Sequence, residues 1–329
     1  MKKIYHLLTS TALACIGGLG VGLLYPAETK VWVQARAAAT QPVTLQFQAR
    51  VGDQPFRCNQ SYMLGTPASS VTPLDFRFYV SDVALIDVNG NTVPLTLEQD
   101  GRWQYENVAL LDFEDKSGGC TNGTVAMNDR IVGTVPSGNY TGLQFTVGVP
   151  FELNHADSTL AASPLNLTSL WWNWQSGYKF MRIDLSTTHL TGMLSNSAPK
   201  HERQPQHQSE HGSSGHEQTH EGDGENSQAF FIHLGSTGCE SAAGAQRPSS
   251  CSNPNRSTIT LTEFDPNQNV IVADLAALVA ETNLRTNQPN TAPGCMSDPS
   301  DRDCTGLMHA LGLAFNGAVA YQQTFFNVE

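Results

Sequence analysis

The sequence predicts an all-β protein, an antiparallel β-sandwich or barrel with one or two short helices and a disordered histidine-rich insertion. Three observations support this fold class. Segments from Thr40 onward alternate apolar and polar residues, or are rich in β-branched and aromatic residues. Turn-forming sequences such as PSGN and DPNQN separate them. Patterns of helical period are sparse, and strands at this spacing favour a sandwich or barrel.

The predicted strands are distributed along the whole chain after residue 40. In order they are VTLQFQARV (43–51), LDFRFYVSDVALIDV (74–88), VALLDFED (108–115), YTGLQFTVGVPF (140–151), YKFMRIDLSTTHL (178–190), AFFIHLG (229–235) and STITLTEF (257–264). No internal repeat is present, and no clear linker separates two folded halves. We therefore expect residues 40–329 to form a single domain.

Two segments have the apolar spacing of a helix, VADLAALVAETNL at 272–284 and TGLMHALGLAF after Cys304. We expect short helices there that decorate the β-core. The segment 199–226 differs from the rest, because histidine is its only aromatic residue and it contains no aliphatic side chain. Such a segment cannot bury enough surface to fold, so we expect a flexible loop inserted between two strands.

Residues 1–39 have the features of a secretory signal peptide. Two lysines precede an apolar stretch, and cleavage after Ala37 or Ala39 fits an A-x-A pattern. We therefore expect a periplasmic or secreted protein. A lipoprotein site at Cys15 fits less well, because the sequence after it stays apolar. An uncleaved membrane anchor stays open as an alternative, since the apolar run approaches the roughly 20 residues that span a bilayer.

Composition and charge exclude several functions. The chain has 329 residues, of which 40% are hydrophobic and 15% charged, and this suits a globular core. Without residues 1–39 it keeps 14 basic and 29 acidic residues, so the formal charge changes from −12 to −15. Nucleic acid is not expected as a partner of so acidic a chain. The sequence contains no hydrolase, P-loop, dinucleotide or haem-attachment signature, so we do not expect a hydrolase.

The cysteines predict a disulfide framework. Six of the seven remain after removal of the signal, and an even number in an exported chain favours three disulfides. Two pairs would close short loops and leave one long-range pair, which gives Cys239–Cys251, Cys295–Cys304 and Cys58–Cys120. A zinc–thiolate site is the alternative, but the sequence contains no CxxC pair.

The insertion holds half of the histidines of the chain, mixed with glutamates. Several imidazoles on a mobile tether provide weak, adaptable sites for copper, zinc or nickel. We therefore expect an auxiliary metal-gathering role, the alternative being a solvated polar loop without a ligand. A fixed site is not expected there, because ordering the loop costs conformational entropy. The candidate ligands are His201, His207, His211, His216 and His220.

Three of the five tryptophans lie together in WWNWQSGYKF. In an extended segment Trp172 and Trp174 would share one face, and Trp171 and Asn173 the other. One alternative is that these side chains fill the core. Another is that they form the exposed stacking surface of an extracellular binding or adhesion module.

Five segments together resemble the bacterial MbnP family, also called the four-Cys proteins of the metallo-mystery pair system. They occur in the family's order and span nearly the whole mature chain. The segments are FRFYVSDVALI (76–86), FELNHADSTLAASPLNL (151–167), WNWQSGYKFMRIDL (172–185), HLGSTGC (233–239) and CTGLMHALGL (304–313).

This resemblance implies a periplasmic β-sandwich that binds copper and is not itself an enzyme. It also implies a dihaem, cytochrome c peroxidase-like partner of the MbnH type, which oxidises a tryptophan of its substrate to kynurenine. On this sequence it favours His155 and His233 as copper ligands, with His189 as a further candidate, and Trp172 or Trp174 as the oxidised residue. The chain has six cysteines where the family name counts four, so one disulfide is expected to be particular to this branch.

Overall fold

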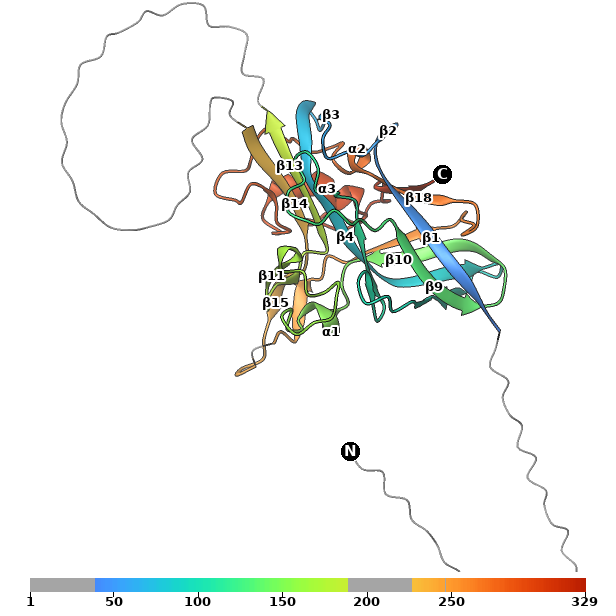
Figure 1. The fold of residues 1–329 in the computed structure, drawn as a ribbon. Coiled ribbons are helices and arrows are strands. Elements are labelled where there is room, and N and C mark those ends of the chain that lie inside the picture. The colour runs from blue at the N-terminus through green and yellow to red at the C-terminus, as the bar shows by residue number, and fades with distance from the viewer. Residues whose placement is uncertain (1–38, 189–226, 246) are drawn as a thin grey trace, which may run out of the picture. The chain divides into compact units, whose positions relative to one another are not determined.

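A computed structural model describes residues 39–188, 227–245 and 247–329. Within these ranges the chain consists mainly of β-strands with a few short helices, which confirms the all-β prediction. Two large sheets form the layers of a sandwich, and two short ribbons accompany them (Figure 1). In this described part of the chain, no helix combines the length and the apolar character that crossing a membrane requires.

The first sheet has six strands and is organised around β1 (Thr40–Val51). Burial alternates along β1, as the alternation of its sequence predicts. β1 runs antiparallel to β9 and parallel to β18. The other strands of this sheet are β2 (Gln54–Pro55), β6 (Thr96–Leu97), β9 (Arg130–Pro136), β18 (Val270–Asp274) and β20 (Phe326–Val328).

The second sheet has ten strands and is organised around the long strand β4 (Ser69–Asp87). Its main order is β17-β10-β4-β13-β14-β19, and β3, β5 and β8 also pair with β4. The other strands of this sheet are β3 (Tyr62–Leu64), β5 (Thr92–Pro94), β7 (Gln104–Tyr105), β8 (Val108–Asp112), β10 (Tyr140–Val147), β13 (Met181–Thr188), β14 (Ser227–Leu234), β17 (Ser257–Leu261) and β19 (Gly294–Cys295).

Aromatic side chains join the two sheets in the core. Phe47 of β1 meets Phe145 of β10 with ring centroids 5.8 Å apart. Phe326 of β20 lies 5.1 Å from Phe145 and 5.6 Å from Phe78 of β4. These edge-to-face contacts are the geometry that aromatic pairs prefer, and each such buried side chain contributes about 1.5–3 kcal/mol. The core therefore lies between the two sheets.

The helices are shorter than the sequence pattern predicts. The helix expected over 272–284 is wrong for most of its length, because its first residues belong to β18 and pair with β1. Only one turn, α2, follows, and Asp274 caps it by accepting a hydrogen bond from the backbone N–H of Ala276. The helix expected after Cys304 is present as α3. The helical elements are α1 (Phe151–Asn154), η1 (Thr168–Leu170), α2 (Leu275–Leu278), η2 (Arg302–Cys304) and α3 (Thr305–Ala310).

The three expected disulfides are confirmed. Cys58–Cys120 joins residues 62 positions apart, Cys239–Cys251 joins residues 12 apart, and Cys295–Cys304 joins residues 9 apart. The second of them links the two strands of a ribbon made of β15 (Thr237–Glu240) and β16 (Ser250–Asn253). The other ribbon consists of β11 (Trp171–Asn173) and β12 (Gly177–Tyr178).

Candidate metal centre

Helix α1 and the two ribbons meet beside the second sheet (Figure 1). Asn154, the last residue of α1, fixes part of this arrangement, because its side-chain oxygen accepts a hydrogen bond of 2.8 Å from the backbone N–H of Tyr178. Gly177 permits the close approach. Its φ is +79°, and a Cβ at this position would lie 2.4 Å from that same oxygen. Gly177 and the backbone N–H of Tyr178 therefore allow the tryptophan segment to pack against α1.

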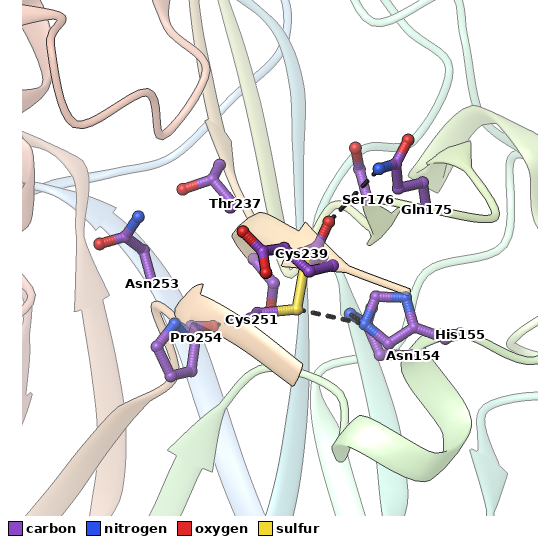
Figure 2. Close-up of a disulfide and its surroundings, with 12 residues drawn as sticks. Asn154, His155, Gln175, Ser176, Thr237, Cys239, Cys251, Asn253 and Pro254 are labelled. Carbon is purple, nitrogen blue, oxygen red and sulfur yellow. Dashed lines mark hydrogen bonds between the residues drawn. A yellow bond between two sulfur atoms is a disulfide. The ribbon is translucent and has the colours of Figure 1, made fainter. Parts of the chain in front are cut away.

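His155 follows Asn154 and is 4% exposed. Its Nδ1 lies 3.3 Å from the carbonyl oxygen of Trp174. Its Nε2 lies 3.2 Å from Nδ2 of Asn154 and 3.5 Å from Sγ of Cys251 (Figure 2). Because a carbonyl oxygen only accepts, Nδ1 carries the proton and Nε2 keeps its lone pair. Burial lowers the pKa of His155, and the charge of Arg247 lowers it further. The ring is therefore neutral and can ligate a metal.

His155 lines a cavity of about 340 Å³ together with Trp171, Trp174 and Arg247. Trp174 is 47% exposed. Trp171 is half-buried, and its indole N–H is buried without an acceptor among the described residues. The cavity thus brings one neutral imidazole beside two oxidisable indole rings.

The expected sharing of one face by Trp172 and Trp174 is wrong. β11 ends at Asn173, whose side chain accepts hydrogen bonds of 3.0 and 2.8 Å from the backbone N–H groups of Gln175 and Ser176. This capping of a turn by asparagine stops the strand alternation before Trp174. Trp174 therefore joins Trp171 at the cavity, whereas the ring of Trp172 lies 6.5 Å from that of His233.

Replacing Gly235 with alanine is expected to displace the indole of Trp172. A Cβ at Gly235 would lie 2.4 Å from Cζ3 of Trp172 and 2.8 Å from the backbone oxygen of Tyr178, so the ring must move. Overpacking of this kind costs about 1–3 kcal/mol. Near-ultraviolet circular dichroism would report the change in ring environment. Gly138→Ala is the matched control, because a Cβ there makes only ordinary contacts. An unchanged spectrum in Gly235→Ala would contradict the packing described here.

His233 of β14 lies beside Asp184 of β13, with Nε2 2.7 Å from Oδ1. Arg182 stands opposite His233 in the strand register, binds Asp184 at 2.6 Å and approaches Asp75 of β4 at 3.1 Å. Arg77 binds Asp75 through Nε and Nη2. We call Asp75, Arg77, Arg182, Asp184 and His233 the charged row. The row crosses three adjacent strands. Its contacts alternate in sign from Arg77 through Asp75 and Arg182 to Asp184, so each buried charge meets a partner.

The charged row sets the proton position on His233. Burial alone would raise the pKa of Asp184, but hydrogen bonds from His233 and Arg182 outweigh it and the pKa lies below its usual value. The ionised carboxylate accepts, so Nε2 of His233 carries the proton and Nδ1 keeps the lone pair. Burial lowers the pKa of His233 against the opposing effect of Asp184, so the ring is neutral. A carboxylate that orients the second ring nitrogen is typical of metal-ligating histidines.

The two favoured histidines lie beside the same tryptophan segment. His155 contacts the backbone of Trp174, and His233 lies next to the ring of Trp172. Among the residues that the structure describes, no hydrogen bond or ring contact joins the two histidines directly. His189 and the histidines of the insertion lie outside the described residues, namely His201, His207, His211, His216 and His220.

Sequence analysis did not identify Asp184 or Cys251 as neighbours of these histidines. Asp184 had a detectable signal, because charged residues alternate with apolar ones in both DFR (75–77) and RID (182–184). Charges at alternate positions of two otherwise apolar strands indicate a buried ionic face. The contact between His155 and Cys251 has no comparable local signal, since 96 positions separate the two residues.

Comparison with known proteins gives two matches to the same family. The family model MbnP matches residues 40–297. Among solved structures, MbnP from Methylosinus trichosporium matches with a TM-score of 0.68 and 28% sequence identity, over 88% of this chain and 98% of that chain. A comparison with curated protein sequences gives no match. Because the family model spans well over half of the sequence and the fold agrees, this chain belongs to the MbnP family.

Proposed function

We propose that this chain is an exported copper-binding protein, periplasmic or secreted, that carries copper and has no catalytic activity of its own. The observation that supports it is the imidazole of His155, which is neutral, is held in one orientation by the carbonyl of Trp174, and lies beside two indole rings in one cavity. Neutral imidazole suits copper and needs no proton loss before it binds. The signal-like N-terminus and the three disulfides agree with an oxidising compartment outside the cytoplasm.

His155 and His233 are the residues that fit copper. His155 offers Nε2, while the carbonyl of Trp174 fixes its other nitrogen, and His233 offers Nδ1, while Asp184 fixes its other nitrogen. The pKa of each ring is lowered by burial, so protons do not compete with the metal near neutral pH. Copper would be cargo at these residues, and the chain's part is to bind and orient it.

We further propose that a dihaem, cytochrome c peroxidase-like partner oxidises Trp174 to kynurenine, with Trp172 as the alternative. Trp174 is 47% exposed and lines the cavity of His155, so oxidant and water can reach its indole ring. Trp172 is half-buried against Gly235 and His233. Cleavage of the indole of Trp174 would leave a ketone and an aryl amine at the cavity that His155 lines, and the ketone oxygen is a further donor for a metal.

The test is expression with and without the dihaem partner, followed by intact mass, peptide mapping and metal analysis. We expect the peptide containing Trp174 to gain one oxygen and lose one carbon only when the partner is present. Trp174→Phe should abolish this change and Trp172→Phe should preserve it. A change that persists in Trp174→Phe would contradict the assignment.

Copper retention is tested separately from the oxidation. A variant that lacks residues 200–221 removes the histidines of the insertion, and we expect it to retain one copper per chain after dialysis. His155→Ala in that background should lose the copper. Copper bound equally by both proteins would exclude the proposed ligand, and no copper in either would exclude a fixed site.

The alternative, an extracellular adhesion module, requires the three tryptophans to form one exposed surface. Trp174 is exposed, but Trp171 and Trp172 are half-buried and lie in different surroundings. This arrangement favours the copper proposal over an aromatic binding platform.

Replacing Asp184 with asparagine is expected to weaken copper binding about 10–100-fold, the usual cost of losing the residue that orients a ligating histidine. The amide removes the negative charge that holds the proton on Nε2 of His233. Competition with a chromophoric copper chelator would measure the change. Asp53→Asn, at an exposed turn, is the control. An affinity unchanged in Asp184→Asn would exclude His233 as a ligand.

A further inference from the structure

Three ligand atoms lie together where α1 meets the ribbon of β15 and β16 (Figure 2). Nε2 of His155 and the sulfurs of Cys239 and Cys251 are all within 4.8 Å of one another. The two sulfurs are bonded to each other. Because the thiolate is the form of cysteine that binds metals, this group cannot act as a metal site while the disulfide is intact. It becomes a Cys₂His group once the bond is reduced.

This disulfide is the one that a reductant reaches most easily. Cys251 is partly exposed, whereas both cysteines of each of the other two disulfides are at most 2% exposed. Thiol–disulfide exchange requires access of a thiolate to a sulfur. The sulfur of Cys251 lies 3.5 Å from Nε2 of His155, a residue that also lines the cavity. Mild reduction should therefore open Cys239–Cys251 and leave the buried disulfides closed.

The spacing of the ligands suits a tetrahedral thiophilic ion. For metal–sulfur and metal–nitrogen bonds of about 2.3 and 2.0 Å, a tetrahedral angle separates sulfur from nitrogen by about 3.5 Å. The distance from Cys251 Sγ to His155 Nε2 is already 3.5 Å. Only Cys239 must move away from its partner sulfur, to about 3.8 Å for the same bond lengths and angle. The imidazole is thus in place before the disulfide opens.

The ribbon of β15 and β16 allows Cys239 to move, whereas His155 is held in place. Cys239 and Cys251 are directly opposite in an antiparallel ladder, so their side chains leave the same face of the ribbon. The ribbon has only two strands and belongs to neither large sheet, so its cysteines can adjust. His155 is held from the other side by the carbonyl of Trp174. To bind a metal, its Nε2 gives up only the 3.2 Å contact with Asn154.

We propose that Cys239, Cys251 and His155 form a redox-gated metal site for a thiophilic ion such as Cu(I) or Zn(II), with a fourth position left for water or another ligand. A dithiol reductant supplies two electrons, its two thiols become a disulfide, and each freed protein sulfur takes up one proton. Metal binding then releases these two protons as both thiolates bond to the ion. In the oxidised protein His155 is the one member of this group that can bind a metal, because the disulfide occupies both sulfurs. Reduction adds the two thiolates to it as ligands.

The test uses Co(II), which reports thiolate ligands by an intense ultraviolet charge-transfer band. The mature protein, without the signal residues 1–39 and hence without Cys15, is reduced with dithiothreitol without denaturant and freed of reductant under nitrogen. One portion is alkylated to map its free thiols by mass spectrometry. We expect two thiols per chain, at Cys239 and Cys251, and a band that saturates at one cobalt per chain. Oxidised protein should give no such band, and added Zn(II) should abolish it.

Cys239→Ser/Cys251→Ser should lose the band completely, and His155→Ala should weaken cobalt binding. Circular dichroism verifies that each variant keeps its β-structure, and alkylation of the two thiols in the wild type gives the same loss without any mutation. A reduced wild type without the band, thiols that map to other cysteines, or a band that survives in the double serine variant would each overturn the proposal. Copper bound by His155 and His233 in the oxidised protein does not require these sulfurs, so the two proposals fail independently.

Discussion

Replacing Arg77 with methionine is expected to lower the free energy of unfolding by about 3–5 kcal/mol, the usual cost of removing one partner of a buried ionic group. The side chain of Arg77 is 2% exposed, and it binds the fully buried carboxylate of Asp75 through two nitrogens. Methionine keeps most of the volume but removes the charge. Among the described residues, Asp75 would then keep Arg182, 3.1 Å away, as its one ion-pair partner.

Two further carboxyl groups would lose the same cation. Burial raises the pKa of Asp112 to about 7, and the charge of Arg77 opposes this rise. Burial also raises the pKa of Glu114, again against Arg77, and Oε2 of Glu114 has no hydrogen-bond partner among the described residues. Removal of Arg77 would therefore leave a cluster of buried acidic groups short of positive charge.

Urea denaturation of the oxidised protein measures this effect, with Arg50→Met as the matched control. Arg50 forms an ion pair of 2.7 Å with Glu329, and their side chains are 22% and 50% exposed, against 2% and 0% for Arg77 and Asp75. Exposed ion pairs contribute little to stability, so this variant should unfold almost as the wild type does. Equal losses of stability in the two variants would contradict a structural role for the charged row.

The strands with one face in the core could be predicted from the sequence, because burial imposes alternation on them. β1 is the clearest case, with buried and exposed residues alternating along most of its length. β18 was missed because Ile271, Val272 and Ala273 are all buried, which leaves an apolar run with no period of two. The apolar residues that follow it in α2 gave the whole segment a helical spacing. Length alone could not separate the two elements.

The site could be predicted only in part, because its histidines carry a sequence signal and their partners do not. Position in the tertiary fold decides the partners: Asp184 is 49 positions from His233, and Cys251 is 96 positions from His155. The strand register and the placement of a short ribbon bring them together. The sequence could not distinguish the surroundings of Trp172 from those of Trp174, because strand alternation places both on one face. Asn173 instead begins a turn, which this alternation does not predict.

Removing the Cys58–Cys120 disulfide by double alanine substitution is expected to lower the free energy of unfolding by about 4 kcal/mol, more than for either other disulfide. The loop-closure contribution grows with the length of chain enclosed, which is 62 positions here against 12 for Cys239–Cys251. The same relation gives about 3 kcal/mol for the shorter loop. Chemical denaturation of the two double variants, each under oxidising conditions, measures this difference. Equal losses would show that loop length does not control the effect.

This disulfide also fixes the segment that carries Glu114, whose pKa responds to the charge of Arg77, so its loss should not be independent of Arg77→Met. The backbone N–H of Gly119 donates to the carbonyl of Cys58 at 3.0 Å, and Glu114 accepts from the backbone N–H of Thr124 at 3.0 Å. Without the disulfide, this segment would let water reach Glu114 and Arg77. Water then solvates these charges, so the loss of an ion-pair partner costs less free energy. Neighbouring sites couple by about 0.5–3 kcal/mol. We therefore expect the variant that combines Cys58→Ala/Cys120→Ala with Arg77→Met to lose less stability than the sum of the separate losses. A strictly additive loss would mean that the segment keeps Glu114 and Arg77 buried without the disulfide.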